Sequence, residues 1–368
     1  MDSHVLIHER IERAADSGVL DLSGLGLSSL PEEVRALREL SWLDIADNHI
    51  VELPHWLGEL GSLTWLEGAG NQLTRLPESA RHLDRLTLLD LSGNQLTTFP
   101  EQLTELPSLL QLKLAANEIG DLPEDSLRLP RLTALDLHGN RLGKIPGGLA
   151  EAMELTVVDF GGNGLSEVPE SLRELSRLSV VQLADNRLRQ LPEWLGRLDD
   201  LTTLVVSGNE LRAFPEALCS LSRLRRLDLG GNRIPTLPER LGSLHSLTCL
   251  DVSDNLLRDI PGSLPTLHGL TRLDLRGNHL HTLPPEFSGL RGLTWLGLSS
   301  NPMHRLPECL RELNDLVWLK IAHASLTSLP GWLDGFTRLV ELEVEGNPFD
   351  VTPTQVAGQR LEDLAPAL

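Results

Sequence analysis

The chain has 368 residues, a formal net charge of −20, 40% apolar residues, 4% aromatic residues and three cysteines. No apolar run reaches the roughly 18 residues of a membrane-spanning helix, and the charged N-terminal segment lacks the apolar core of a secretory signal. Acidic residues outnumber basic ones by 52 to 32, which disfavours binding to nucleic acid or to an anionic membrane. The cysteines form no CxxC pair and predict neither a disulfide framework nor a zinc site. We therefore expect a cytoplasmic protein.

The first segment, residues 1–16, is predicted to be a capping helix. Its apolar residues Ile7, Ile11, Ala14 and Ala15 recur at helical spacing, so one face of the helix can cover the apolar side chains that begin after residue 16.

Residues 17–361 consist of a 23-residue unit that recurs fifteen times without insertion or deletion, with the pattern LxxLxLxxNxLxxLPxxLxxLxx. The alternating LxL predicts a short strand with one buried face, and the tail predicts a short helical or 3-10 segment. Position nine is Asn in thirteen units, and we expect its amide to bond backbone groups that would otherwise be buried without partners. Position fifteen is Pro in all fifteen units, which suits the start of the return segment.

Two places depart from this regularity. Gly68 replaces a core Leu, and the resulting void would be costly unless neighbouring side chains fill it. The last unit is degenerate, and residues 354–368 are predicted to form a C-terminal cap that protects the end of the array.

These units resemble the leucine-rich repeat family along essentially the whole chain, and they are most similar to its 23-residue intracellular class, which includes the Ras-suppressor protein, Scribble, Erbin and the repeats of Roco proteins. The resemblance implies an α/β fold, a right-handed solenoid bent into a horseshoe, with a parallel β-sheet on the concave side and short helical or 3-10 segments on the convex side. It also implies a protein partner, for which a small GTPase is a candidate by analogy only. No P-loop is present, because Gly143-Lys144 is followed by Ile.

Position three of the unit varies along the array and is expected to project from the concave face. Trp42 and Trp65 are predicted to lie side by side there, with Leu88 extending their apolar patch. Trp295 and Trp318 are predicted to form a second pair near the other end. The two pairs either mark an interaction surface or stiffen the terminal strands by packing on one another.

A basic area is expected around the second pair. Arg272 would neighbour Trp295 in a cation–π arrangement, and Arg226, Arg276 and Lys320 would enlarge the area. Because exposed Trp and Arg dominate the energetics of protein interfaces, the sequence predicts a non-enzymatic scaffold that binds a protein or an extended polypeptide through these clusters. No cofactor is expected, and the oligomeric state stays open.

The alternative function is a peptide-processing enzyme, or an accessory subunit of one. Position five carries a ladder of carboxylates, in which Asp136 and Asp159 with His138 are the candidate catalytic or metal-binding group. The simpler interpretation is that Asp is the usual residue of this strand in the family and stays solvated or meets an Arg. Recognition of a glycan or lipid outside the cell is disfavoured by the absence of a signal sequence and by the unpaired cysteines.

Overall fold

The structure is a computed structural model that describes residues 3–349. Its contacts divide the chain into two compact units, Met1–Leu183 (unit 1) and Ala184–Leu368 (unit 2). The predicted C-terminal cap, residues 354–368, lies outside the described residues. No helix in the described part is long and apolar enough to cross a membrane.

Unit 1 contains eight short parallel strands that pair in chain order. Each residue pairs with the one 23 positions later, as in the register of Val19 with Trp42. The strands are β1 (Val19–Asp21), β2 (Trp42–Asp44), β3 (Trp65–Glu67), β4 (Leu88–Asp90), β5 (Gln111–Lys113), β6 (Ala134–Asp136), β7 (Val157–Asp159) and β8 (Val180–Gln182).

Unit 2 contains seven parallel strands with the same 23-residue register. They are β9 (Thr203–Val205), β10 (Arg226–Asp228), β11 (Cys249–Asp251), β12 (Arg272–Asp274), β13 (Trp295–Gly297), β14 (Trp318–Lys320) and β15 (Glu341–Glu343).

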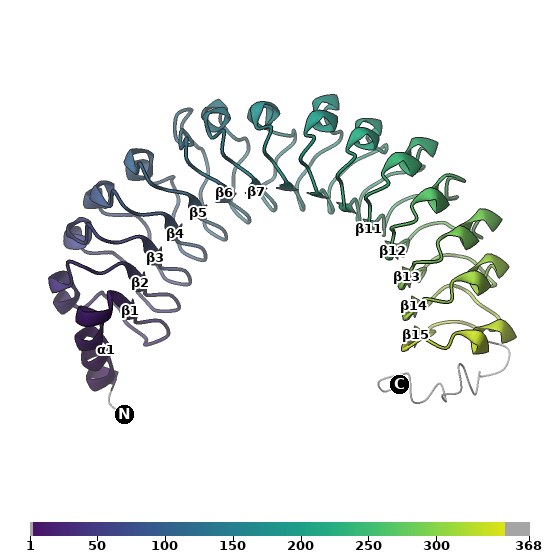
Figure 1. Cartoon of the computed structure of the whole chain (residues 1–368), viewed down its shortest axis with the longest axis horizontal. Coiled ribbons are helices and arrows are strands. Elements are labelled where there is room, and N and C mark those ends of the chain that lie inside the picture. The colour runs from purple at the N-terminus through teal and green to yellow at the C-terminus, as the bar shows by residue number, and fades with distance from the viewer. Residues whose placement is uncertain (1–2, 350–368) are drawn as a thin grey trace. The chain divides into compact units, whose positions relative to one another are not determined.

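Short 3-10 helices form the opposite side of each unit (Figure 1). In twelve repeats the Pro of position fifteen is the residue directly before the 3-10 helix, as predicted. The helices are η1 (Glu32–Ala36), η2 (His55–Glu59), η3 (Glu78–His82), η4 (Glu101–Glu105), η5 (Gly147–Glu151), η6 (Glu170–Glu174), η7 (Glu193–Arg197), η8 (Glu216–Ser220), η9 (Glu239–Ser243), η10 (Leu264–Thr266), η11 (Pro285–Gly289), η12 (Glu308–Glu312) and η13 (Gly331–Gly335). The predicted fold class, a solenoid with parallel strands on one side and 3-10 segments on the other, is confirmed.

The N-terminal helix α1 (Ser3–Ser17) packs on β1. Ile11 and Ala14 are buried in this contact, whereas Ala15, which we expected on the same face, is exposed. The helix ends where Gly18 adopts φ +69° and donates its N–H to the carbonyl of Ala14 at 2.9 Å, a left-handed C-terminal stop that Gly tolerates best.

The position-nine asparagines form the predicted backbone ladder. The twelve from Asn48 to Asn301 are buried. Asn71 Nδ2 donates to the carbonyl of Ile45 in the preceding repeat at 2.8 Å, and its Oδ1 accepts the N–H of Ile50 at 3.0 Å. At Ala324, one of the two exceptions, the N–H of Met303 donates to the Ala324 carbonyl at 3.1 Å instead. Each turn is thus tied to the next through groups that would otherwise be buried without partners.

The core is a column of aliphatic side chains, and its irregular positions are filled by neighbours. A Cβ on Gly68 would lie 3.3 Å from Leu91 Cδ2 and 3.7 Å from Ile45 Cδ1, so these two side chains occupy the space that the missing Leu leaves. Trp56 and Trp194 are buried on the 3-10 side.

Candidate functional site

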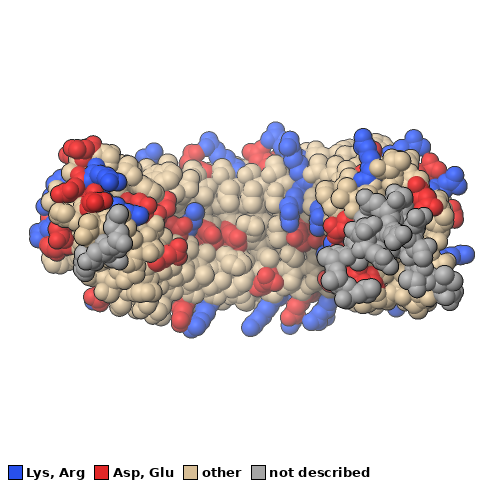
Figure 2. All heavy atoms as spheres, turned by 90° about the horizontal axis from the view of Figure 1, so that it is seen from below, with Lys and Arg blue, Asp and Glu red and all other residues tan. Residues whose placement is uncertain are grey.

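Positions three and five of each strand place their side chains on the same sheet face, because alternate residues of a strand point the same way. Figure 2 looks onto the strand side of the repeats and shows acidic side chains along it in unit 1. The face consists of two columns, one variable at position three and one mainly acidic at position five.

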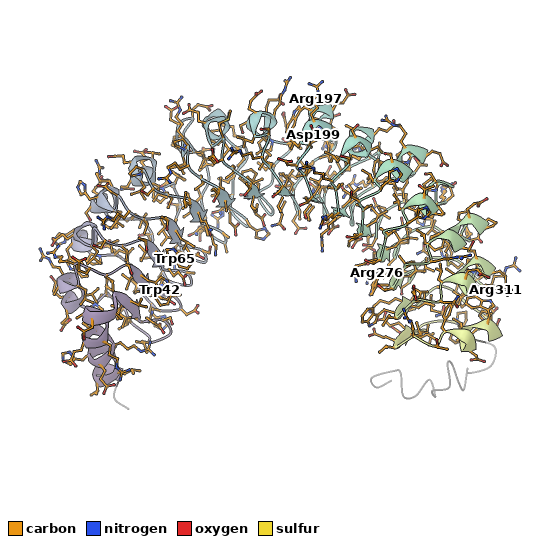
Figure 3. The ribbon with its side chains drawn as sticks, viewed as in Figure 1. Trp42, Trp65, Arg197, Asp199, Arg276 and Arg311 are labelled. Atoms are coloured by element: carbon orange, nitrogen blue, oxygen red, sulfur yellow. The ribbon has the colours of Figure 1, made fainter. Side chains whose placement is uncertain are left out.

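In unit 1 the predicted aromatic neighbours meet. Trp42 pairs in register with Trp65, and both labelled side chains lie on the strand side (Figure 3). Trp65 is 45% exposed and Trp42 is half-buried. Our expectation that Leu88 extends the exposed patch is wrong. Leu88 is only 7% exposed, because this shorter side chain lies in register between Trp65 and Gln111.

Two carboxylates accompany these indoles. Asp44 lies on the strand of Trp42 and Glu67 on the strand of Trp65, and the two pair in register. Neither has a cationic partner within residues 3–349. Burial raises the pKa of Asp44, and the nearby charges of Asp21 and Asp47 raise it further. The Asp44 carboxylate therefore lies among like charges.

Eight of the position-five aspartates share a structural role that the sequence analysis did not predict. Each accepts the backbone N–H two residues later on its Oδ1 atom: Asp21, Asp44, Asp90, Asp136, Asp159, Asp228, Asp251 and Asp274. The bond closes the turn that leads to position eight, where all fifteen repeats have positive φ. This geometry supports the simpler interpretation of the carboxylate ladder.

The structure brings the candidate catalytic group together. His138 Nδ1 lies 3.6 Å from Asp159 Oδ1, and Asp136 pairs in register with Asp159. Gln182 Nε2 donates to the other oxygen of Asp159 at 2.9 Å. Burial raises the pKa of Asp136, as does the charge of Asp159. In residues 3–349 no three His, Cys, Asp or Glu side chains are grouped in a way that could hold a metal ion.

In unit 2 the predicted stacking of Arg272 on Trp295 is confirmed. The Cζ atom of Arg272 lies 3.6 Å from the centroid of the Trp295 ring, and that of Arg276 lies 5.7 Å away. The expected exposure of Trp295 is wrong, since only 8% is exposed. A Cβ on Gly297 would lie 2.8 Å from Trp295 Cη2, so the ring occupies the space that a side chain at this position would need.

Asp274 holds the two arginines. It is completely buried and accepts two hydrogen bonds from Arg276, at 2.8 Å from Nε and 2.7 Å from Nη2. These bonds raise the pKa of the Arg276 guanidinium, which lies on the strand side (Figure 3). Arg272 Nη2 lies 4.0 Å from the same carboxylate. The buried carboxylate and the Trp295 ring thus fix the positions of both guanidinium groups.

The remaining predicted residues of unit 2 differ in their environments. Trp318 is 39% exposed. The Lys320 ammonium pairs with Glu343 and, at 3.3 Å, with Glu341. Lys320 thus does not extend the basic area, because two carboxylates surround its charge.

Arg226 is the most solvent-accessible of the predicted basic residues. Its side chain is 53% exposed, and its Nη2 lies 3.5 Å from Asp228 Oδ2. The basic area is therefore interleaved with carboxylates rather than continuous.

Sequence reasoning also missed a hydroxyl ladder at position two. Ser or Thr at this position donates its hydroxyl to the carbonyl one repeat earlier, as from Thr64 to Ser41 at 2.8 Å in unit 1 and from Thr271 to Thr248 at 3.1 Å in unit 2. The column of Ser and Thr is visible in the sequence, but its partners become apparent only with the structure.

The 3-10 side of unit 1 carries a pocket with a volume of about 540 Å³. Arg75, Arg81, Glu101 and Asp121 contribute to its lining. It lies beside the segment directly after Pro123, where turns replace the 3-10 helix. Its charges are mixed, and it lies away from the strand face.

The family models that match this chain all describe leucine-rich repeats. Models described as leucine-rich repeats match residues 69–119, 176–234 and 245–303, a model of two repeat copies matches 222–266, and a single-repeat model matches 131–152. The comparison with curated proteins gave no match.

Solved structures agree. A leucine-rich repeat protein of Leptospira interrogans aligns with a TM-score of 0.86 and 29% identity over 94% of both chains. An internalin of Listeria monocytogenes aligns with a TM-score of 0.75 over 92% of this chain and 94% of its own; at 20% identity it shows the fold alone. The Arabidopsis receptor kinase HAESA, in complex with the peptide hormone IDA and a co-receptor, aligns with a TM-score of 0.72 and 26% identity over 90% of this chain and 62% of that chain. The chain therefore belongs to the leucine-rich repeat family.

Proposed function

We propose that this chain is a non-enzymatic scaffold that binds a protein or an extended polypeptide on the strand side of its repeats. The observation that carries the proposal is the exposure of Trp65 (45%) and Trp318 (39%) at position three. Exposed Trp side chains are enriched among the residues that dominate interface energetics. The complex of HAESA with a peptide hormone is a precedent within the same fold.

The predicted binding residues take different parts in this proposal. Trp42, Trp65 and Trp318 supply apolar contact area, and Arg226 supplies an accessible charge. Arg272 and Arg276 are held by Asp274 and Trp295 and are not free side chains. Groups that are held in place before binding lose less conformational entropy when a partner binds. We assign the position-five aspartates to their turns, because eight of them accept a backbone N–H.

The cellular setting belongs to the same proposal. Cys219, Cys249 and Cys309 are free, which suits a reducing compartment. With the 23-residue unit, this supports a cytoplasmic protein of the intracellular class, for which a small GTPase is a candidate partner by analogy alone.

Site-specific photo-crosslinking in cells tests the proposal. A photoreactive amino acid is placed at Gln111 or Thr203 on the strand side and, as matched controls, at Arg197 or Arg311 on the 3-10 side (Figure 3). We expect discrete protein adducts from the strand-side positions and none from the controls. Adducts from the 3-10 side alone, or from no position, would contradict the proposal.

A further inference from the structure

A patch on β2 and β3 combines two indoles with two carboxylates. Trp42 and Asp44 lie on one strand, Trp65 and Glu67 on the next, and the four pair in register. Neighbouring strands are about 4.8 Å apart and alternate side chains share a face, so aromatic and acidic groups adjoin within the reach of one side chain. We call these four residues the Trp–acid patch.

The patch lacks positive charge. On the flanking strands, Asp21 pairs with Arg10 at 3.3 Å and Asp90 pairs with Lys113 at 3.3 Å. Between them, Asp44 and Glu67 have no such partner within residues 3–349. Like charges placed directly opposite one another on adjacent strands are unfavourable, and an added cation would relieve that repulsion.

Unit 2 shows the complementary arrangement within the same chain. There Arg272 covers the face of Trp295 at 3.6 Å, and Asp274 anchors the neighbouring Arg276. An indole with a nearby carboxylate thus already binds guanidinium groups in this protein. In the Trp–acid patch the indole and the carboxylates are present, but the sequence supplies no arginine at position three or five of β1 to β4.

We infer that the Trp–acid patch binds an arginine side chain from a basic, extended segment of the partner protein. The inference rests on the proposed function and specifies the partner's chemistry at one place. Arginine fits better than lysine, because its planar guanidinium stacks on an indole while its N–H groups reach carboxylates. The unpaired acidic charge attracts such a segment, and Trp65, the most exposed indole of the patch, provides the stacking surface.

The test measures binding of a fluorescein-labelled peptide of alternating arginine and glycine to the full chain by fluorescence anisotropy. A matched peptide carries citrulline, which has the shape of arginine without its charge. We expect the arginine peptide to bind at least about tenfold more tightly than the citrulline peptide. Trp65→Ala and the double variant Asp44→Asn/Glu67→Gln should each weaken the arginine peptide about tenfold. The Asn and Gln side chains keep a hydrogen-bond acceptor and remove only the charge.

Matched controls separate the patch from the general acidity of the chain. Trp332→Ala removes an indole from the 3-10 side of unit 2, and Asp228→Asn/Asp251→Asn removes the same charge from its strand side; both should bind the arginine peptide like the wild type. Thermal unfolding checks that every variant is folded. Equal losses in patch and control variants would overturn the inference, as would self-association of the chain that Trp65→Ala abolishes, since the occupant would then be a second copy. Failure of the peptide to bind while Gln111 still crosslinks a partner would overturn the inference and leave the proposed function standing.

Discussion

The guanidinium of Arg272 lies 3.6 Å from the ring centroid of Trp295, and the two residues are direct neighbours in register on β12 and β13. The contact leaves this tryptophan, at a surface position, only 8% exposed. Within residues 3–349 no guanidinium covers its counterpart Trp65, which is 45% exposed. Trp295 therefore has a structural role in unit 2, whereas Trp65, at the same repeat position, offers an accessible surface in unit 1.

Gly297→Ala should displace the Trp295 ring. The new Cβ would lie 2.8 Å from Trp295 Cη2 and 2.6 Å from Asp274 Oδ1, closer than such atoms can approach. We expect a loss of about 1–3 kcal/mol in the free energy of unfolding and a red shift of tryptophan emission. Gly262→Ala, whose Cβ would meet nothing within 4 Å, is the control. Unchanged emission and unfolding would show that the ring does not lie over Gly297.

Asn278→Ala should be among the most destabilising single changes at position nine. The amide of Asn278 donates to the carbonyls of Val252 and Leu275 and accepts the N–H of Leu257, at 2.9, 3.0 and 3.0 Å. Since each buried group left without a partner costs about 1–3 kcal/mol, we expect the free energy of unfolding to fall by at least about 3 kcal/mol, measured by urea denaturation. A loss below about 1 kcal/mol would mean that water or a backbone shift replaces the ladder.

Asp136→Asn should stabilise the protein at neutral pH. Burial and the charge of Asp159 raise the pKa of Asp136 in the folded state, so folding favours its protonated form. Its contribution to stability is greatest when it is protonated and is lost as pH rises through its pKa. We expect a higher melting temperature for the variant at pH 7 and no difference below about pH 3.

Asp21→Asn is the control for Asp136→Asn, because its melting temperature should change in the opposite direction. A hydrogen bond from the Ser23 hydroxyl lowers the pKa of Asp21, and Arg10 contributes, so the ionised form stabilises the fold above its unfolded pKa and this contribution is lost as pH falls. Its neutralisation should lower the melting temperature at pH 7. The same direction of change in both variants would refute this description of the carboxylate ladder.

Cys309 should resist alkylation in the folded protein. Burial raises the pKa of its thiol to about 11, so only about a thousandth is thiolate at pH 8, and thiolate is the reactive form. We expect slow modification by iodoacetamide in native buffer and rapid modification in urea, followed by mass spectrometry. Equal rates in the two conditions would show that the fold does not shield Cys309.

The sequence predicted the features that repeat and missed those that depend on individual side chains. The 23-residue spacing defined the strand register, and therefore the contact between Arg272 and Trp295. The burial of Trp295 could not be predicted, because it depends on Gly297 and on the conformers of two arginines.

Lys320 illustrates the same limit. Its position on the strand face follows from the register, but its charge is neutralised by Glu341 and Glu343, one repeat further along. The residues after Pro123 likewise form turns instead of a 3-10 helix. This difference could not be predicted from position fifteen, because Pro occurs there in every repeat.

Hydroxyl-radical footprinting of Trp65 tests the central claim most directly. The oxidation rate of this residue is measured by mass spectrometry with and without the protein that crosslinks at Gln111, and Trp332 on the 3-10 side serves as the internal reference. Binding on the strand face predicts a several-fold slower oxidation of Trp65 at saturating partner and an unchanged rate at Trp332. Unchanged oxidation of Trp65 together with protection of Trp332 would place the partner on the other side and contradict the account.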